Sequence, residues 1–220
     1  MIKRSLFMAL VLVIMAAAPV IDAAAQQTVR LNRMIELWES GKPAIGTFVR
    51  FRDADGALYY ATSDLDFVIF DTEHGPADFT QLRTFLHFMI DKSQLMKKGN
   101  LQPNVTPLAR IPSNGGERNQ WVVKQVLDLG VMGLMSPHIR NVDDARALVA
   151  HSRYPQKVGA ADNDPPGERG VSPSNAARYW GILVPEYFER ADTWPLDPRG
   201  EIAAIAMIES AEGVKNIRAI

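Results

Sequence analysis

The segment from Asp66 to Pro76 constrains the fold of this chain more than any other part of the sequence. Its apolar run, Phe67 to Phe70, has the length and composition of a buried β-strand, and Asp71, Glu73 and His74 follow directly. In parallel α/β folds the carboxyl ends of the strands face the ligand crevice, so titratable residues there often serve function. The alternative is that the two carboxylates only cap the next helix.

Residues 1–25 have the features of a secretory signal peptide. Lys3 and Arg4 precede an apolar run from Leu6 to Val20, and Ala23 to Ala25 supply the small residues that a signal peptidase requires. The run is shorter than the stretch of about 20 apolar residues that a membrane span needs. We therefore expect cleavage before Gln26 and export to the periplasm or the medium, with no membrane attachment after cleavage.

The composition excludes several classes of protein. The chain has no cysteine, so it has neither a disulfide framework nor a lipid-accepting cysteine after the signal. The full sequence has 24 basic and 25 acidic residues, and loss of the signal leaves 22 against 24. This balance offers no basic surface for nucleic acid. Residues 26–220 suffice for one well-buried domain.

Helical and strand patterns alternate along the mature sequence. Strands are expected at 44–49, 67–70, 105–111, 131–136 and 202–208. Helical patterns follow each of them, with predicted starts at Asp78, Asn114 and Asn141, and a predicted stop at Gly130. A helix after every strand is typical of a parallel sheet or a β/α barrel.

Two segments interrupt this alternation. We expect a polar loop from Lys92 to Asn104, and a second, long loop from Tyr154 to Arg199, where seven prolines preclude long regular elements. Within the second loop we expect one short helix near Glu186 to Ala191. Loops of this length in a compact domain usually serve as lids or interfaces. A last helix begins at Glu212 and should still be running at Ile220.

Chemically useful residues follow three of the predicted strands. Glu209 can bind a hard metal ion, Arg110 can stabilise an oxyanion and His74 can transfer protons, provided that the strands are neighbours. Chemistry on a 2-oxo acid requires this set, since a divalent ion chelates the carboxylate and keto oxygens while arginine stabilises the enolate. Each residue also has a plainer interpretation, with Arg110 pairing with Asp71 and Glu209 serving as a helix N-terminal acid.

The remaining histidines and lysines give weaker signals. His138 follows Pro137 at the end of the fourth strand, so it either contacts substrate or has no role in the site. His87 and His151 are interpreted as structural. No lysine falls at the carboxyl end of a predicted strand, which disfavours a Schiff-base aldolase.

Seven short motifs occur in a fixed order along the chain. They are Asp71–Pro76, Leu108–Pro112, Val126–Gly130, Pro137 with Asn141–Ala145, Arg153–Pro155, Arg169–Val171 and Met207–Ser210. In this order the chain resembles the HpcH/HpaI aldolase and citrate lyase family over about residues 31–220. The resemblance rests on all seven motifs in register and not on any one of them.

The resemblance implies a fold and an activity. The fold is an α/β, TIM-type (β/α)8 barrel, of which this chain carries about the first five β/α units, so the domain is expected to be incomplete at its C-terminus. The activity is that of a carbon–carbon lyase, a class II aldolase that cleaves 4-hydroxy-2-oxo acids to pyruvate and an aldehyde through a metal-stabilised enolate. The implied cofactor is Mg²⁺, Mn²⁺ or Co²⁺, and the implied assembly is a homo-oligomer, a trimer or hexamer.

The resemblance also implies a role for each matching residue. His74 corresponds to the acid/base residue, Asp128 to the acid that raises its basicity, Arg110 to the enolate-stabilising and substrate-binding arginine, and Glu209 to a metal ligand.

Four further positions complete the implied site. Asp71 and Glu73 would orient the histidine or the metal's waters. Met207 and His138 would contact substrate, although relatives often carry glutamine at the position of Met207. A second metal-binding aspartate follows the sixth strand in the family, so its counterpart would lie beyond Ile220.

Two other functions stay open from the sequence. One is an acyl-CoA lyase of the same family that cleaves malyl or citryl thioesters, which export disfavours because coenzyme A is an intracellular carrier. The other is an inactive protein that keeps the oxo-acid pocket without turnover.

The signal peptide gives the first prediction. A fusion of residues 1–27 to a reporter should be cleaved and found outside the cytoplasm, because the basic, apolar and small-residue regions follow in the required order. Cell fractionation with immunoblotting measures this. An uncleaved reporter in the cytosol would overturn the expected export.

Overall fold

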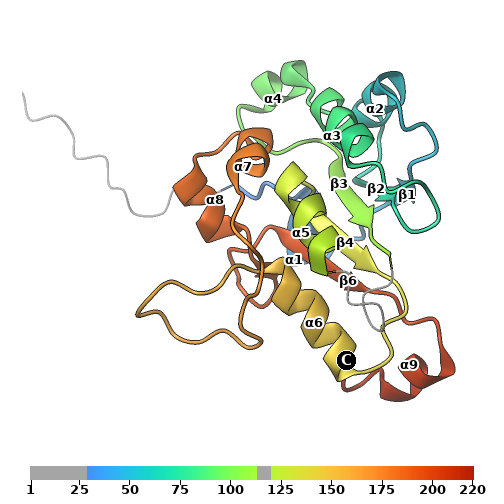
Figure 1. Ribbon diagram of the computed structural model, residues 1–220. Coiled ribbons are helices and arrows are strands. Elements are labelled where there is room, and N and C mark those ends of the chain that lie inside the picture. Colours follow the sequence, from blue (N-terminus) through green and yellow to red (C-terminus); the bar gives the residue numbers. More distant parts are fainter. Residues whose placement is uncertain (1–28, 113–119) are drawn as a thin grey trace, which may run out of the picture.

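A parallel six-stranded sheet forms the centre of the computed structural model, which describes residues 29–112 and 120–220. The strand order is β1-β2-β3-β4-β6-β5, and every neighbouring pair is parallel. The strands are β1 (Gly46–Phe48), β2 (Phe67–Asp71), β3 (Thr106–Arg110), β4 (Gly133–Ser136), β5 (Thr193–Trp194) and β6 (Ile202–Ala206). From β1 to β4 and on to β6 the strands lie in chain order, and β5 is at the edge beyond β6. The expected β/α arrangement is therefore confirmed (Figure 1).

Helices separate the strands along the chain. They are α1 (Arg33–Glu39), α2 (Ala54–Ala61), α3 (Phe79–Phe88), α4 (Lys92–Lys98), α5 (Gln120–Leu129), α6 (Val142–Ser152), α7 (Ser174–Trp180), α8 (Val184–Arg190) and α9 (Ala211–Asn216). The predicted N-caps Asp78 and Asn141 accept hydrogen bonds from the amides of Gln81 and Asp144. Each cap satisfies an amide that would otherwise lack a partner in the first turn of its helix.

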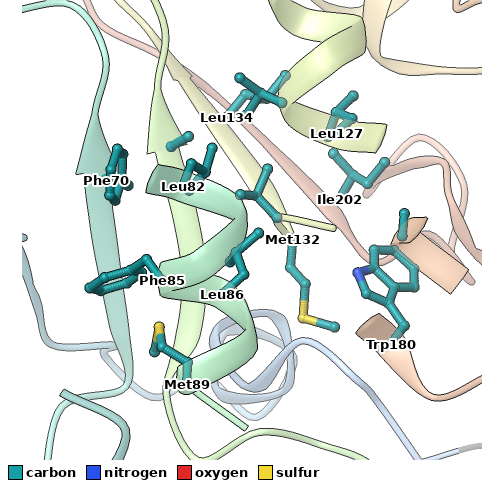
Figure 2. Packing of buried hydrophobic residues seen from close by; sticks show 14 of the residues in the cluster. Phe70, Leu82, Phe85, Leu86, Met89, Leu127, Met132, Leu134, Trp180 and Ile202 are labelled. Carbon is teal, nitrogen blue, oxygen red and sulfur yellow. The ribbon is translucent and has the colours of Figure 1, made fainter. Parts of the chain in front are cut away.

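The two faces of the sheet have different surroundings because successive side chains of a strand point to opposite sides. On the outer face, Phe70 packs edge-on against Phe85 of α3, with ring centroids 5.4 Å apart (Figure 2). Leu134 and Ile202 belong to the same large cluster, together with residues of α3, α5 and α7. On the inner face a smaller cluster contains Met34, Ile69, Leu108 and Ala203. The inner face therefore leads along β2 and β3 to Asp71 and Arg110 at their carboxyl ends.

The prediction of a loop from Lys92 to Asn104 is partly wrong. Residues Lys92–Lys98 form α4, which is capped by Asp91 and ends at Gly99 with a φ of 70°. None of its side chains is fully buried, so the helix lacks the apolar face that periodicity detects. Its start and stop signals, an aspartate and a glycine, were present in the sequence.

The long segment from Tyr154 to Arg199 contains more regular structure than expected. It holds two helices, α7 and α8, and the short strand β5. Pro173 is the N-cap of α7, and Pro185 lies in the first turn of α8. Proline costs little there, because the first amides of a helix have no intrahelical partner. The short helix expected near Glu186 to Ala191 is confirmed as α8, whereas Pro173 begins a helix, α7, that was not expected.

Three smaller expectations have mixed outcomes. The helix start at Asn114 lies outside the described residues, whereas the stop at Gly130 is confirmed by its φ of 113°. The last helix, α9, ends at Asn216 instead of continuing to Ile220. The strand expected at 202–208 is found as β6, Ile202–Ala206, and β5 pairs with it at Ile202 and Ala203.

In the described part of the chain, no helix is long and apolar enough to cross a bilayer.

A buried carboxylate attaches the N-terminal segment to the amino-terminal edge of the sheet. Glu201 is 1% exposed and accepts hydrogen bonds from the amides of Leu31 (3.1 Å) and Asn32 (2.9 Å). Arg190 donates to the same carboxylate at 2.7 Å. The Asn32 side chain in turn donates to the carbonyl of Met132. The Glu201 carboxylate thus connects the start of α1 to the segment that leads into β6.

We predict that Glu201→Ala lowers the free energy of unfolding by about 3–5 kcal/mol, because it leaves a partly buried guanidinium and two amides without their acceptor. Urea unfolding followed by circular dichroism measures this. Glu212→Ala, which removes an exposed carboxylate in the first turn of α9, is the matched control. A loss below about 1 kcal/mol for Glu201→Ala would contradict this role.

Candidate active site

An ion pair between neighbouring strands lies at the centre of the site. Asp71 and Arg110 are paired residues in the register of β2 and β3, and both follow the inner-face alternation. Arg110 donates from Nε to Asp71 Oδ1 at 2.9 Å and from Nη2 to Oδ2 at 2.6 Å. Its guanidinium also lies 4.6 Å from the ring centroid of Phe48 on β1. The strand register and the aromatic ring together fix the plane of this cation.

The Asp71 carboxylate also organises the loop that follows β2. Its Oδ1 accepts hydrogen bonds from the amides of Glu73 (3.0 Å) and His74 (3.3 Å). Burial alone would raise the pKa of Asp71, but the hydrogen bonds from Arg110 and from these amides outweigh it and lower the pKa. The hydrogen bond with Asp71 raises the pKa of Arg110. Asp71 is therefore held as the anion, confirming that it pairs with Arg110.

Glu73 links the cation to both histidines of the site. One oxygen of its carboxylate lies 3.2 Å from Arg110 Nε and 3.5 Å from His74 Nε2. The other lies 3.8 Å from His138 Nε2. The Glu73 side chain is only 12% exposed, whereas that of His74 is 73% exposed. The carboxylate is thus buried against the sheet while the imidazole reaches solvent.

His138 and Glu209 bring the ends of β4 and β6 into the same cluster. His138 has a φ of 58°, a left-handed conformation that costs energy for a residue with a side chain. Its amide donates to Glu209 Oε1 at 3.0 Å, and its Nδ1 lies 3.3 Å from the same oxygen. The cap of α9 is Ser210, whose hydroxyl accepts from the amide of Gly213. Glu209 therefore contacts His138 in the site, and Ser210, not Glu209, caps the helix that follows.

The structure thus brings together most of the predicted site residues, which are Asp71, Glu73, His74, Arg110, His138 and Glu209. Met207 lies directly after β6, and its amide donates to the carbonyl of Ser136 at 2.9 Å. In the described ranges, no group of three or more His, Cys, Asp or Glu side chains has the spacing of a complete metal site.

Asp128 does not lie with this cluster. It is in the last turn of α5, which leads to the amino end of β4, whereas the cluster is at the carboxyl ends of the strands. Its carboxylate pairs with Arg169 at 2.8 Å, and Arg169 also donates to the hydroxyl of Tyr187. Burial raises the pKa of Asp128, against the opposing effect of Arg169. Within this chain the structure therefore does not support the expected contact between Asp128 and His74.

Two residues of the site were not predicted from the sequence. Phe48 lies against Arg110, and Arg52 donates to main-chain carbonyls of the loop after β2. Arg52 could have been found, because it is a polar residue just beyond the carboxyl end of a predicted strand. Phe48 gave no signal, since an aromatic residue in a strand is ordinarily part of the core.

Comparisons with known proteins agree with this geometry. The model of the family described as HpcH/HpaI aldolase/citrate lyase matches residues 44–220. The 5-keto-4-deoxy-D-glucarate aldolase of Enterobacter sp. (strain 638) is 34% identical over 70% of this chain and 48% of its own length. The pyruvate aldolase of Rhizobium etli is 30% identical over 86% of this chain and 62% of its own length. The chain therefore spans about half to two thirds of these relatives.

A solved structure gives the same result for the fold. The crystal structure of a HpcH/HpaI aldolase/citrate lyase family protein from Burkholderia cenocepacia J2315 superimposes with a TM-score of 0.63. It is 26% identical in sequence, and the match covers 84% of this chain and 63% of that one.

The ionised state of Asp71 gives a pH-dependent prediction. A carboxyl whose pKa is lowered on folding contributes stability that is complete above its ordinary pKa of 3.8 and is lost as the pH falls through the folded value. Asp71→Asn should therefore lower the free energy of unfolding by about 1–3 kcal/mol at pH 6. The difference from the wild type should shrink as the pH falls below 3.8.

Urea unfolding at pH 6, 4.5 and 3 measures this difference. Asp64→Asn, which changes an exposed aspartate before β2, controls for the loss of one charge. If the effect of Asp71→Asn were the same at all three pH values, the lowered pKa would be disproved.

Proposed function

This chain belongs to the HpcH/HpaI aldolase/citrate lyase family, and on this premise we propose that it acts as a divalent-metal-dependent aldolase. The proposed reaction cleaves a 4-hydroxy-2-oxo acid to pyruvate and an aldehyde. The observation that carries the proposal is the convergence of Arg110, His74 and Glu209 from the ends of three strands, with Glu73 between them. The names of the aldolase relatives support the same reaction class.

Arg110 is suited to stabilise negative charge on an oxo-acid oxygen. Its Nε and Nη2 are committed to Asp71, and none of the described residues accepts a hydrogen bond from Nη1. The N–H groups of Nη1 can therefore donate to the oxygen that becomes negative as the enolate forms. Because the ion pair and the Phe48 ring already fix the guanidinium, little reorganisation is needed during the reaction.

His74 is suited to move the protons of the reaction. In the cleavage direction its imidazole takes the proton of the 4-hydroxyl group as the bond between carbons 3 and 4 breaks. The bonding electron pair stays on the pyruvate fragment as the enolate, and the aldehyde leaves. Carbon 3 then takes up a proton and becomes the methyl group of pyruvate. Glu73, 3.5 Å from His74 Nε2, orients the imidazole for these transfers.

The donor set fits a hard divalent cation. Asp71, Glu73 and Glu209 place three carboxylates near one guanidinium, so acidic groups outnumber this cation in the cluster. Glu209 is the proposed ligand, with Glu73 nearby, and ions such as Mg²⁺ often bind through one or two carboxylates and complete their shell with water and substrate oxygens. When bound, Mg²⁺, Mn²⁺ or Co²⁺ would polarise the carboxylate and keto oxygens of the oxo acid.

Three further features remain predictions of this proposal. His138 and Met207 would contact the substrate from the ends of β4 and β6. The protein would be exported, and it would assemble as a homo-oligomer. Size-exclusion chromatography with light scattering would measure the assembly.

Exchange of the pyruvate methyl protons with D₂O tests the proposal, because it reports enolate formation without any aldehyde. The wild type should catalyse exchange with Mg²⁺, Mn²⁺ or Co²⁺ and lose it on chelation. His74→Ala should lower the rate about 10² to 10⁴-fold, as expected for loss of a positioned acid/base group. Glu209→Ala should abolish the response to metal. Arg110→Lys should lower the rate about tenfold or more, because lysine keeps the charge but loses the planar fork of donors.

His87→Ala is the matched control, because it removes an exposed histidine on α3, outside the site. Its exchange rate should equal that of the wild type. Wild-type protein that binds pyruvate but shows no exchange with metal supplied would favour the inactive binding protein. Cleavage of malyl-CoA in place of a 4-hydroxy-2-oxo acid would favour the acyl-CoA lyase.

A further inference from the structure

We propose that Arg52 is a positioning residue that fixes the loop from Thr72 to Pro76, on which Glu73 and His74 lie. Arg52 itself lies in the connection between β1 and α2, next to the N-cap Asp53. Its effect on catalysis rests on the proposed function, whereas its effect on the loop can be measured without it.

Arg52 binds the main chain at both ends of this loop. Nη2 donates to the carbonyl of Asp71, the last residue of β2, and Nη1 donates to the carbonyl of Pro76 at 3.2 Å. The two carbonyls bracket Thr72 to Gly75. A guanidinium presents its donors in a rigid planar fork, so one side chain sets the separation of the two ends.

The Arg52 guanidinium is held in place from the core. It lies 4.5 Å from the ring centroid of Phe70, which is 1% exposed and packs edge-on against Phe85. The outer face of β2 therefore supports the same cation that binds the loop above it. Stacking on a buried ring keeps the guanidinium plane fixed.

The sequence of the loop matches this close approach. A Cβ atom added at Gly75 would overlap the Arg52 guanidinium and approach the carbonyl oxygen of Asp71, so a larger residue there would displace Arg52 from its present position. Gly75 belongs to the segment that carries Glu73 and His74, and the steric fit explains a glycine that has ordinary backbone angles.

Arg52 and Asp71 hold different parts of the loop. The Asp71 carboxylate accepts from the amides of Glu73 and His74, in the first half. Among the described residues, Arg52 is the one donor to the carbonyl of Pro76, in the second half. Loss of Arg52 should therefore loosen the loop while leaving the Asp71–Arg110 pair intact.

The position of His74 depends on this backbone. Its imidazole is 73% exposed, and its side-chain ion-pair contact within the described residues is with Glu73, which lies on the same loop. A displacement of the loop would therefore move His74 and would stretch the contact of Glu73 with Arg110. A displacement of about 1 Å at a reacting group can lower a rate about 10²-fold.

Amide hydrogen exchange of the full chain tests the structural part. Arg52→Ala should speed exchange of the Glu73 and His74 amides at least tenfold, because their hydrogen bonds to Asp71 open more often once the far end of the loop is released, with little change in the strands. Arg33→Ala is the matched control, because Arg33 pairs with Asp66 at the opposite end of β2 (3.0 Å). Unchanged protection of the Glu73 and His74 amides in Arg52→Ala would overturn the proposal.

Exchange of the pyruvate methyl protons tests the catalytic part. Arg52→Ala should lower kcat about 10 to 100-fold with KM for pyruvate within threefold, and added guanidinium ion should restore part of the rate. Arg52→Lys, which keeps the charge and also guards against misfolding of the alanine variant, should remain impaired because it cannot bind both carbonyls. Wild-type rates in both variants, or loss of activity without rescue and with equal loss in Arg33→Ala, would refute the role.

The two measurements separate this proposal from the proposed function. If the wild type showed no methyl exchange, the aldolase proposal would fail, and amide exchange in Arg52→Ala would still decide whether Arg52 fixes the loop.

Discussion

The pairing of Asp71 with Arg110 is the interaction on which the site depends. It requires β2 and β3 to be neighbours in one register, because the two residues are directly opposite each other. Thr72 strengthens the same junction, since both its amide and its hydroxyl donate to the carbonyl of Arg110. A shift by one residue would move Asp71 to the outer face, where the helices pack. The hydrophobic pattern that fixes the register therefore also fixes the charged pair.

The electrostatics of the site follow from this pair. Asp71 neutralises Arg110 and, as the anion, binds the amides that shape the next loop. Glu73 then adds a second carboxylate beside the same guanidinium, and Glu209 adds a third beside His138. Such a concentration of carboxylates repels itself unless cations are near. Three carboxylates near one guanidinium leave a net negative charge, which the proposed divalent ion would offset.

Much of the fold could be predicted from local pattern. The apolar strands, the caps Asp78 and Asn141 and the stop at Gly130 were correctly identified, because each depends on the preferences of a few neighbouring residues. The expected helix near Glu186 to Ala191 was found as α8, but α4 and α7 were missed. Helix α4 buries no side chain completely, and α7 begins at a proline that was interpreted as a breaker. In α4 the terminal caps and not an apolar face mark the helix, and in α7 the proline lies at the start of the helix, where it is tolerated.

The residues at the carboxyl ends of the strands could be identified from the amino-acid sequence, because strand ends are local features. They are the candidates Asp71, Glu73, His74, Arg110, His138 and Glu209. Which of these candidates contact one another depends on the packing of the strands. It separated Asp128, whose carboxylate is bound by Arg169 at the other end of the sheet, and it added Phe48 and Arg52. The hydrogen bonds of Arg52, Asp128 and His138 join residues that are 19 to 71 positions apart along the chain, and they depend on the order and register of the strands. No local preference encodes that order, because it arises from burying all the apolar faces at once.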